Sequence, residues 1–194
     1  TCYLFGASMG DTRTQFNKWT HVDEVEVSIT GGTIFGSIFG ANRYNGTPYG
    51  DATVNVYKTA HTADNKYPPI PEGLNTDEEI LAWLGTLPHN LNNFAIEAAF
   101  GGSDLVDYTP RAGKKATVNV FQCDENTVRD VYGGGNAAAI GSANAGYQTD
   151  AYVNIYGGRF YRVFGGGNGE VSPADVYGTA NTTIDGGLIY NLFG

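Results

Sequence analysis

Short alternations of aliphatic and polar residues recur along the chain and predict strands. In the first four segments two apolar residues flank a polar one, which is the period of a half-buried β-strand. The segments begin at Val27, Val54, Val118, Val153 and Thr182, so their first positions lie 27, 64, 35 and 29 residues apart. We interpret the 64-residue interval as one repeat that carries a large insertion. The pattern therefore predicts a repeat protein.

A second signature follows each alternation: an aliphatic residue, an aromatic residue and then one or more glycines. The aromatic residues are Phe39, Phe100, Tyr132, Phe164 and Phe193. Glycine runs allow sharp turns, because glycine adopts positive φ at little steric cost. A repeat this short cannot bury its apolar face alone, so we expect successive repeats to stack with parallel strands about 4.8 Å apart. The expected fold class is all-β, a parallel β-helix (β-solenoid) with one short helix-containing insertion.

Stacking of equivalent positions predicts columns of like side chains. We expect one interior wall to combine the aliphatic residues of the first signature, which are Val27, Ile29, Val54, Val56, Val118, Val120, Val153, Ile155 and Ile184. In the second signature the aliphatic and aromatic columns are adjacent, so only one of them can face inward unless the strand bends. The asparagines after the glycines, Asn42, Asn136 and Asn168, either stack as a hydrogen-bonded ladder or serve left-handed turn geometry.

The chain divides into three parts by composition. Residues 1–22 are expected to be an N-terminal cap or lead-in, and residues 23–194 to be the repeats, interrupted by an insertion at 58–93. Within the insertion, Thr76 and Glu79 have capping-box spacing and predict a helix that Gly85 ends. The last signature is incomplete at the end of the chain, which predicts an open strand edge. The partners expected there are other repeats or subunits.

Composition narrows the function classes. The chain is 41% hydrophobic and 16% charged, which is enough apolar content for a folded core. Its net charge of −9 argues against nucleic acid as a partner. No apolar run reaches the roughly 18 residues of a membrane span. Cys2 and Cys123 form either one disulfide, as would suit an exported protein, or two reduced thiols.

Few residues suggest ligand chemistry. Tyr67 and Trp83 in the insertion can stack on sugar rings or simply pack. Asp104, Asp107 and Arg111 form a mixed-charge cluster near a predicted strand, to be read either as part of a polysaccharide site or as a solvated turn. These five residues are the candidates for ligand binding. No catalytic residue is assigned.

Cofactor and metal motifs are not found. His21, His61 and His89 lack the spacing of a metal site, and no Gly-Lys-Ser/Thr follows the glycine triplets. Repeated calcium sites would need an aspartate at a fixed place in each repeat, whereas Ala137 and Gly169 follow the asparagines. We expect no cofactor and no metal cluster, although scattered aspartates leave one structural calcium possible.

The runs that end in Asn136 and Asn168, each preceded by an aliphatic-Asn-aliphatic strand, resemble glycine-rich repeats of large secreted or surface proteins of Bacteroides-like gut bacteria. The resemblance covers about residues 23–57 and 94–194 and implies a right-handed parallel β-helix. It also implies a secreted or cell-surface location and a non-enzymatic structural or adhesive segment, a scaffold or fibre subunit that displays loops. The alternatives are a polysaccharide lyase or hydrolase on such a fold and a carbohydrate-binding module.

Overall fold

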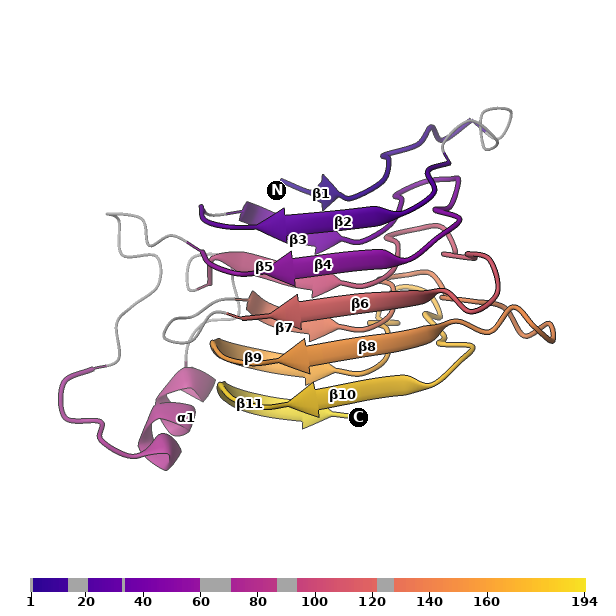
Figure 1. The fold of residues 1–194 in the computed structure, drawn as a ribbon. Coiled ribbons are helices and arrows are strands. Elements are labelled where there is room, and N and C mark those ends of the chain that lie inside the picture. The colour runs from indigo at the N-terminus through magenta and orange to yellow at the C-terminus, as the bar shows by residue number, and fades with distance from the viewer. Residues whose placement is uncertain (1, 14–20, 33, 60–70, 87–93, 122–127) are drawn as a thin grey trace.

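The computed structural model describes residues 2–13, 21–32, 34–59, 71–86, 94–121 and 128–194 (Figure 1). Its elements are β1 (Leu4–Phe5), β2 (Val25–Ile29), β3 (Ile34–Phe39), β4 (Ala52–Val56), α1 (Asp77–Thr86), β5 (Ile96–Phe100), β6 (Lys115–Val120), β7 (Val128–Tyr132), β8 (Asp150–Ile155), β9 (Arg159–Phe164), β10 (Ala180–Ile184) and β11 (Leu188–Phe193). From β1 onward, consecutive strands alternate between two parallel sheets. Sheet A has the order β1-β3-β5-β7-β9-β11, and sheet B has the order β10-β8-β6-β4-β2.

The predicted fold class, an all-β right-handed parallel β-helix, is wrong. The described strands form two separate parallel sheets of six and five strands, accompanied by one short helix, and no closed solenoid is found among them. Where a closed wall would need a third sheet, the described residues make only isolated bridges, from Tyr108 to Ile140 and from Ile140 to Val176. The physical reason is that the glycine-rich segments after sheet A turn rather than extend. We call the observed assembly the two-sheet stack.

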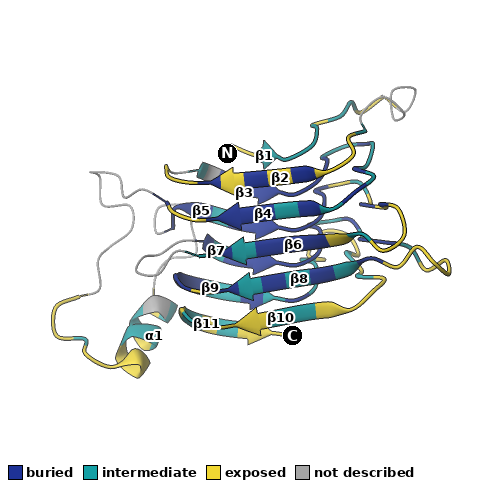
Figure 2. Cartoon of the chain, in the orientation of Figure 1, coloured by how far each residue is buried: buried dark blue, intermediate teal, exposed yellow. Residues whose placement is uncertain are grey.

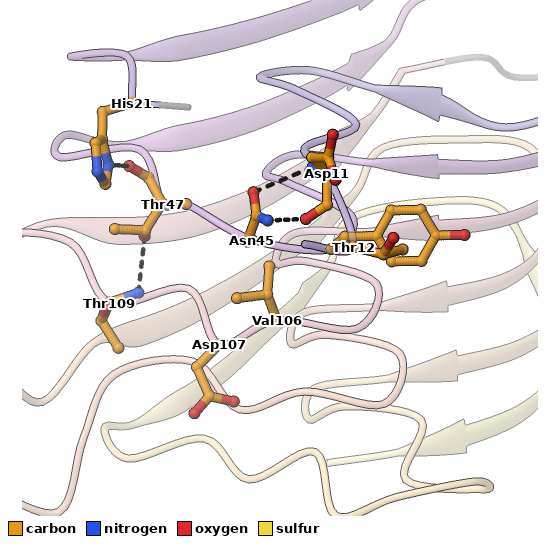
Figure 3. Close-up of a pocket in the computed structure, with 10 residues that line it drawn as sticks. Asp11, Thr12, His21, Asn45, Thr47, Val106, Asp107 and Thr109 are labelled. Atoms are coloured by element: carbon orange, nitrogen blue, oxygen red, sulfur yellow. Dashed lines mark hydrogen bonds between the residues drawn. The ribbon is translucent and has the colours of Figure 1, made fainter. Parts of the chain in front are cut away.

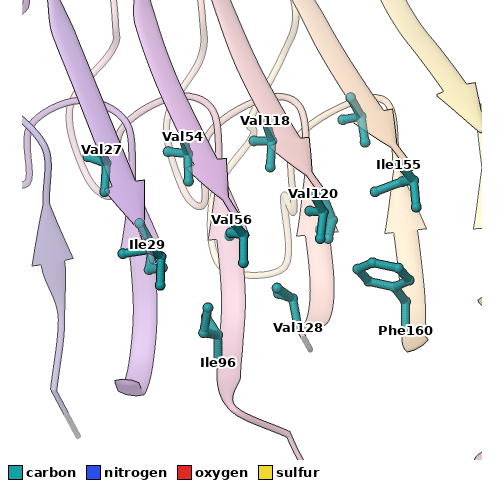
Figure 4. Close-up of a cluster of buried hydrophobic side chains, with 14 of the residues drawn as sticks. Val27, Ile29, Val54, Val56, Ile96, Val118, Val120, Val128, Ile155 and Phe160 are labelled. Carbon is teal, nitrogen blue, oxygen red and sulfur yellow. The ribbon is translucent and has the colours of Figure 1, made fainter. Parts of the chain in front are cut away.

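The register within sheet B follows the alignment of the repeats. Val27 pairs with Val54, Val54 with Val118, and Val118 with Val153, and the column ends on Thr182. The aliphatic side chains of this sheet face those of sheet A and form the main core (Figure 4). Burying each such side chain contributes on the order of 1.5–3 kcal/mol. The observed strand pairs confirm the predicted in-register pairing of these strands.

In sheet A the aliphatic column faces inward and the aromatic column faces outward. Ile38, Val131 and Val163 belong to the main core, whereas Phe39 and the other aromatic residues form a cluster of their own. Successive rings stack nearly parallel at centroid distances of 5.1, 4.8, 4.7, 4.8 and 4.6 Å, along the column Phe5, Phe39, Phe100, Tyr132, Phe164 and Phe193. Although it lies outside the main core, this column buries Phe39 to 1% exposure because each ring covers its neighbours.

A smaller core lies on the loop side of the two-sheet stack. Tyr108 and Ile140 are fully buried there against a column of alanines, Ala41, Ala52, Ala116 and Ala151. The Tyr108 hydroxyl donates to the carbonyl of Gly50. Burial, and secondarily the charge of Asp51, raises the pKa of this hydroxyl. These contacts fix the loops that follow sheet A against the start of sheet B.

The helix of the insertion begins as predicted and ends later. The Glu79 carboxylate accepts from the Thr76 amide at 3.1 Å, and the Glu79 amide donates to the Thr76 hydroxyl at 3.3 Å, which is a capping box. Gly85 lies inside α1 rather than ending it. A Cβ at this position would overlap the Tyr190 ring of β11, so the glycine permits close packing of α1 on sheet A. Trp83 packs against the main core.

The expected N-terminal cap is only partly described. Within residues 1–22, β1 adds a short first strand to sheet A through Leu4 and Phe5. Of the insertion at 58–93, α1 and the residues just before it are described. The opposite end of the two-sheet stack is more exposed: β10 and β11 show exposed residues where the inner strands are buried (Figure 2).

Candidate functional site

An ion-pair and amide ladder runs along the loops that follow sheet A. The Arg43 guanidinium lies 3.3 Å from Asp104, whose other carboxylate oxygen accepts from the Asn136 amide at 2.9 Å. Asn168 in turn donates to the Asn136 side-chain oxygen at 2.8 Å. Asp104 is only 5% exposed, so its charge depends on these partners. Asp104 is therefore a structural member of the ladder.

Asn42 does not lie in this ladder. Counted from the aromatic residue of each repeat, the position occupied by Asp104 and Asn136 is held in the first repeat by Arg43. Asn42 lies one residue earlier, is fully buried, and donates to the carbonyl of Asn45 at 2.8 Å. The cause is the missing glycine in the first repeat, which shifts its asparagine by one position. The prediction that Asn42 stacks with the other two asparagines is wrong for that reason.

A second amide ladder, on sheet B, was not predicted as such. Asn154 donates to Asn119 at 2.8 Å, Asn119 donates to Asn55 at 2.8 Å, and Asn55 donates to the Glu26 carboxylate at 3.1 Å. Each side-chain amide donates its N–H to the preceding repeat. The ladder therefore ends where Asn55 donates to the Glu26 carboxylate, a group that can only accept hydrogen bonds. The repeated Val-Asn-Val/Ile pattern could have predicted this ladder, because the three asparagines are the polar residues at equivalent positions of these strands.

The outer face of sheet A carries a buried charge network. Asp130 is 1% exposed and accepts from Arg162 at 2.8 and 2.7 Å and from Arg129 at 2.9 Å. Arg129 also lies 3.7 Å from Glu97. Hydrogen bonding to Asp130 raises the pKa of Arg162. Sequence reasoning missed this network because Asp130 and Arg162 are 32 residues apart and meet only through the strand register.

This network borders a groove of about 220 Å³ on sheet A. Its floor includes the aromatic column, and its other side includes Asn136, Asn168 and Glu170. Asp130 is paired with Arg129 and Arg162 along this groove, whereas Glu170 is an exposed carboxylate of the lining. The groove therefore offers a ligand planar hydrogen-bonding groups beside the aromatic column, together with this carboxylate.

A cavity of about 500 Å³ lies among the loops at the N-terminal end (Figure 3). His21 contacts the carbonyl of Thr47 at 3.0 Å and stacks on Tyr49 with 4.7 Å between ring centroids. Asp11, also in the lining, is bound by Arg13, which lowers the pKa of its carboxyl to about 2. Asp107 also lines this cavity, and its carboxylate accepts from the Ala139 amide of the next repeat at 2.9 Å.

The structure separates the predicted ligand-binding residues. Of the three in the mixed-charge cluster, only Asp107 lines the large cavity, since Asp104 is buried in its ladder and Arg111 is exposed, 3.7 Å from Asp23. Trp83 packs on the main core. Tyr67 lies outside the described residues. The five candidates therefore do not come together as one site in the part of the chain that is described.

The described ranges were searched for metal-ligating clusters, free cysteines and membrane-spanning helices. No cluster of three or more His, Cys, Asp or Glu residues that could hold a metal ion occurs within them. Cys2 is an exposed free thiol, whereas Cys123, His61 and His89 lie outside the described residues. No described helix has the length and apolarity needed to cross a membrane.

The aromatic column should make stability depend on alkaline pH. Burial, helped by the charge of Asp130, raises the pKa of Tyr132 from 10.0 to about 12. An unfolded tyrosine ionises near pH 10, so the contribution of Tyr132 is complete below pH 10 and is lost as pH rises from 10 to 12. We expect urea unfolding to show a smaller fall in free energy over this range for Tyr132→Phe than for the wild type. An equal fall in both proteins would contradict the assignment.

Comparisons of the chain with protein-family models, with curated proteins and with solved structures found no match.

Proposed function

We propose that this chain is a non-enzymatic structural segment of a larger exported bacterial surface protein. In this role the two-sheet stack is a rigid scaffold that holds its loops outward. The proposal includes a secreted or cell-surface location, for which the support is the resemblance of the repeats. Labelling of intact producing cells with antibodies against the folded chain tests that location.

One observation carries the proposal: two buried carboxylates, those of Asp104 and Asp130, are bound to side chains of adjacent repeats. Asp104 binds Arg43 and Asn136, and Asp130 binds Arg129 and Arg162. Catalysis by paired carboxylates needs groups that can exchange a proton with a substrate. Carboxylates held in ladders instead stabilise the stack, because each one satisfies donors on the next repeat.

Limited proteolysis tests the scaffold role. A rigid stack opens rarely, so we expect cleavage to be confined to loops while both sheets remain intact under native conditions. Early cleavage within β6 or β8, at the centre of sheet B, would contradict a rigid scaffold.

Carbohydrate binding is the second candidate, and the cavity of Figure 3 favours it. Its lining combines Tyr44 with hydroxyl, amide and carboxylate groups, among them Thr47, Asn45 and Asp107. Such convergent polar groups around a concave surface are typical of small-ligand sites. The wild type and Asp107→Asn should then be compared on a glycan array and in a depolymerisation assay. The scaffold proposal predicts no binding and no product for either protein. Product formed by the wild type and lost in the variant would instead establish an enzyme.

A further inference from the structure

A second row of aromatic rings lies on the outer face of sheet B, at the residue that follows each of three strands. Tyr57, Phe121 and Tyr156 follow β4, β6 and β8. Their rings stack nearly parallel, with centroids 4.9 and 5.0 Å apart and planes inclined by 7° and 2°. The backbone pairing of the strands continues through them, because the Phe121 amide donates to the carbonyl of Val56 and the Tyr156 amide donates to that of Val120. The strand register therefore fixes this row, which we call the outer aromatic row.

The outer aromatic row is open to solvent, unlike the aromatic column of sheet A. Tyr57 and Tyr156 are 45% and 42% exposed, although β4, β6 and β8 are all inner strands of their sheet. In the column of sheet A, by contrast, Phe39, Phe100 and Tyr132 are at most 3% exposed. The exposure of the outer aromatic row is thus a property of the inner repeats and does not depend on the ends of the stack. Contiguous exposed apolar surface is a common mark of interaction sites.

The amide ladder of sheet B borders this row. Its three asparagines lie two residues before the three rings, so both rows face the same side of the sheet, about 6.6 Å apart along the strands. Each side-chain amide has a second N–H besides the one that it donates within the ladder. The outer face of sheet B therefore presents a strip that is aromatic along one margin and hydrogen-bonding along the other.

Opposite charges lie at the two ends of the outer aromatic row. Lys58 directly follows Tyr57 and is exposed. At the other end, Asp185 takes the position next to Tyr156, because its amide donates to the carbonyl of Ile155 as the ring residues donate to the strands before them. The row from Tyr57 to Asp185 spans three strand steps, about 14 Å. A ligand that fits this row is accordingly long, flat and positively charged at one end.

We propose that the outer aromatic row binds flat, elongated aromatic cations, which lie lengthwise across the three rings with the positive end toward Asp185. A planar ligand in this position meets each ring at its edge, and edge-to-face contact is a favoured arrangement of aromatic pairs. The net charge of −9 on the chain attracts a cation from a distance, and the Asp185 carboxylate orients it. This binding site is separate from the scaffold role and does not depend on it.

Thioflavin T tests the site, because it is a flat dye with its positive charge on one of two linked ring systems. Its fluorescence rises when binding holds the two ring systems in one plane. We expect a saturable rise with wild-type protein that sedimentation shows to be monomeric. No rise with the monomer, or a signal that is removed together with sedimenting aggregates, would overturn the proposal.

Phe121→Leu removes the middle ring but keeps an apolar side chain, so we expect thioflavin T to bind about tenfold more weakly. Circular dichroism shows whether this variant folds, and Tyr57→Leu, a change at an exposed position, tests the same row if it does not. Tyr147→Leu is the matched control, because Tyr147 is 57% exposed and lies outside the row. It should bind the dye as the wild type does. Equal affinities of the row variant and the control variant would overturn the assignment.

Charge variants test the orientation of the ligand. Asp185→Asn should weaken the binding of thioflavin T about threefold and Lys58→Gln should strengthen it by a similar factor, as expected for exposed charges. Congo red, a flat dye that carries sulfonates, should bind more weakly than thioflavin T. Binding of Congo red that equals or exceeds that of thioflavin T would contradict a site for cations.

Discussion

Replacing Gly133 with alanine is expected to destabilise the protein by about 3 kcal/mol, because the added methyl group has no room. A Cβ at Gly133 would overlap the carbonyl oxygen of Gly165 and lie 3.1 Å from the Ala151 side chain. The same close approach occurs along the column, from Gly40 to Gly101 and from Gly101 to Gly133. Since the obstructing atom is backbone, relief requires that two repeats move apart. Urea unfolding monitored by circular dichroism measures the change.

Gly166→Ala is the matched control in the same class of turn. A Cβ at Gly166 would meet no heavy atom of the described residues within 4 Å, so we expect a change below about 0.5 kcal/mol. Equal losses for the two variants would mean that glycine acts through chain flexibility. In that case the close contact between repeats would not be the cause.

Asp130→Asn is expected to cost about 3 kcal/mol, because it removes a buried carboxylate that is paired with two arginines. Asp130 is 1% exposed and accepts three hydrogen bonds from Arg129 and Arg162, each of 2.9 Å or less. The amide keeps the shape of the side chain but presents an N–H group toward a guanidinium. Thermal and urea unfolding of the variant measure the loss.

Glu97→Gln provides the comparison for this prediction. Glu97 lies on the adjacent strand, 3.7 Å from Arg129, and its side chain is 27% exposed. A partly exposed pair at this distance is worth under about 1 kcal/mol. If the Glu97 variant were destabilised as much as the Asp130 variant, the effect would come from net charge. Burial of Asp130 would then not explain it.

Sequence patterns predicted the strands and their pairing because both are local or periodic properties. Val54 and Val118 are 64 residues apart in the chain, yet the shared Val-Asn-Val pattern was enough to pair them. The capping box of Thr76 and Glu79 depends on residues only three apart and was equally accessible.

Features that depend on contacts between residues far apart in the sequence were predicted less well. The fold class was wrong because the pattern shows that repeats stack but does not show how many sides of the stack are strands. Gly85 was read as a helix end, since its contact with Tyr190 is more than 100 residues away in sequence. Asn42 was assigned one position out of place because a deleted glycine shifts the register without changing the motif.

The candidate site was the least predictable part. Asp104 was predicted only as part of a mixed-charge cluster, either in a polysaccharide site or in a solvated turn. Its partner Arg43 lies in another repeat, so the sequence alone did not indicate that Asp104 is buried in a ladder. Asp130 showed no signal at all, because a single acid in a strand normally faces solvent.

The central claim is that residues at equivalent positions of successive repeats are neighbours across the sheets. Intramolecular cross-linking tests it directly in a background that lacks the two native cysteines. Asn55 and Asn119 lie on paired strands, whereas Asn55 and Asn154 are separated by two strand steps, about 10 Å, which is beyond the reach of a disulfide. We predict rapid disulfide formation in the variant with Asn55→Cys and Asn119→Cys, and none in the variant with Asn55→Cys and Asn154→Cys. Equal cross-linking of the two variants, or cross-linking of the second alone, would contradict the account.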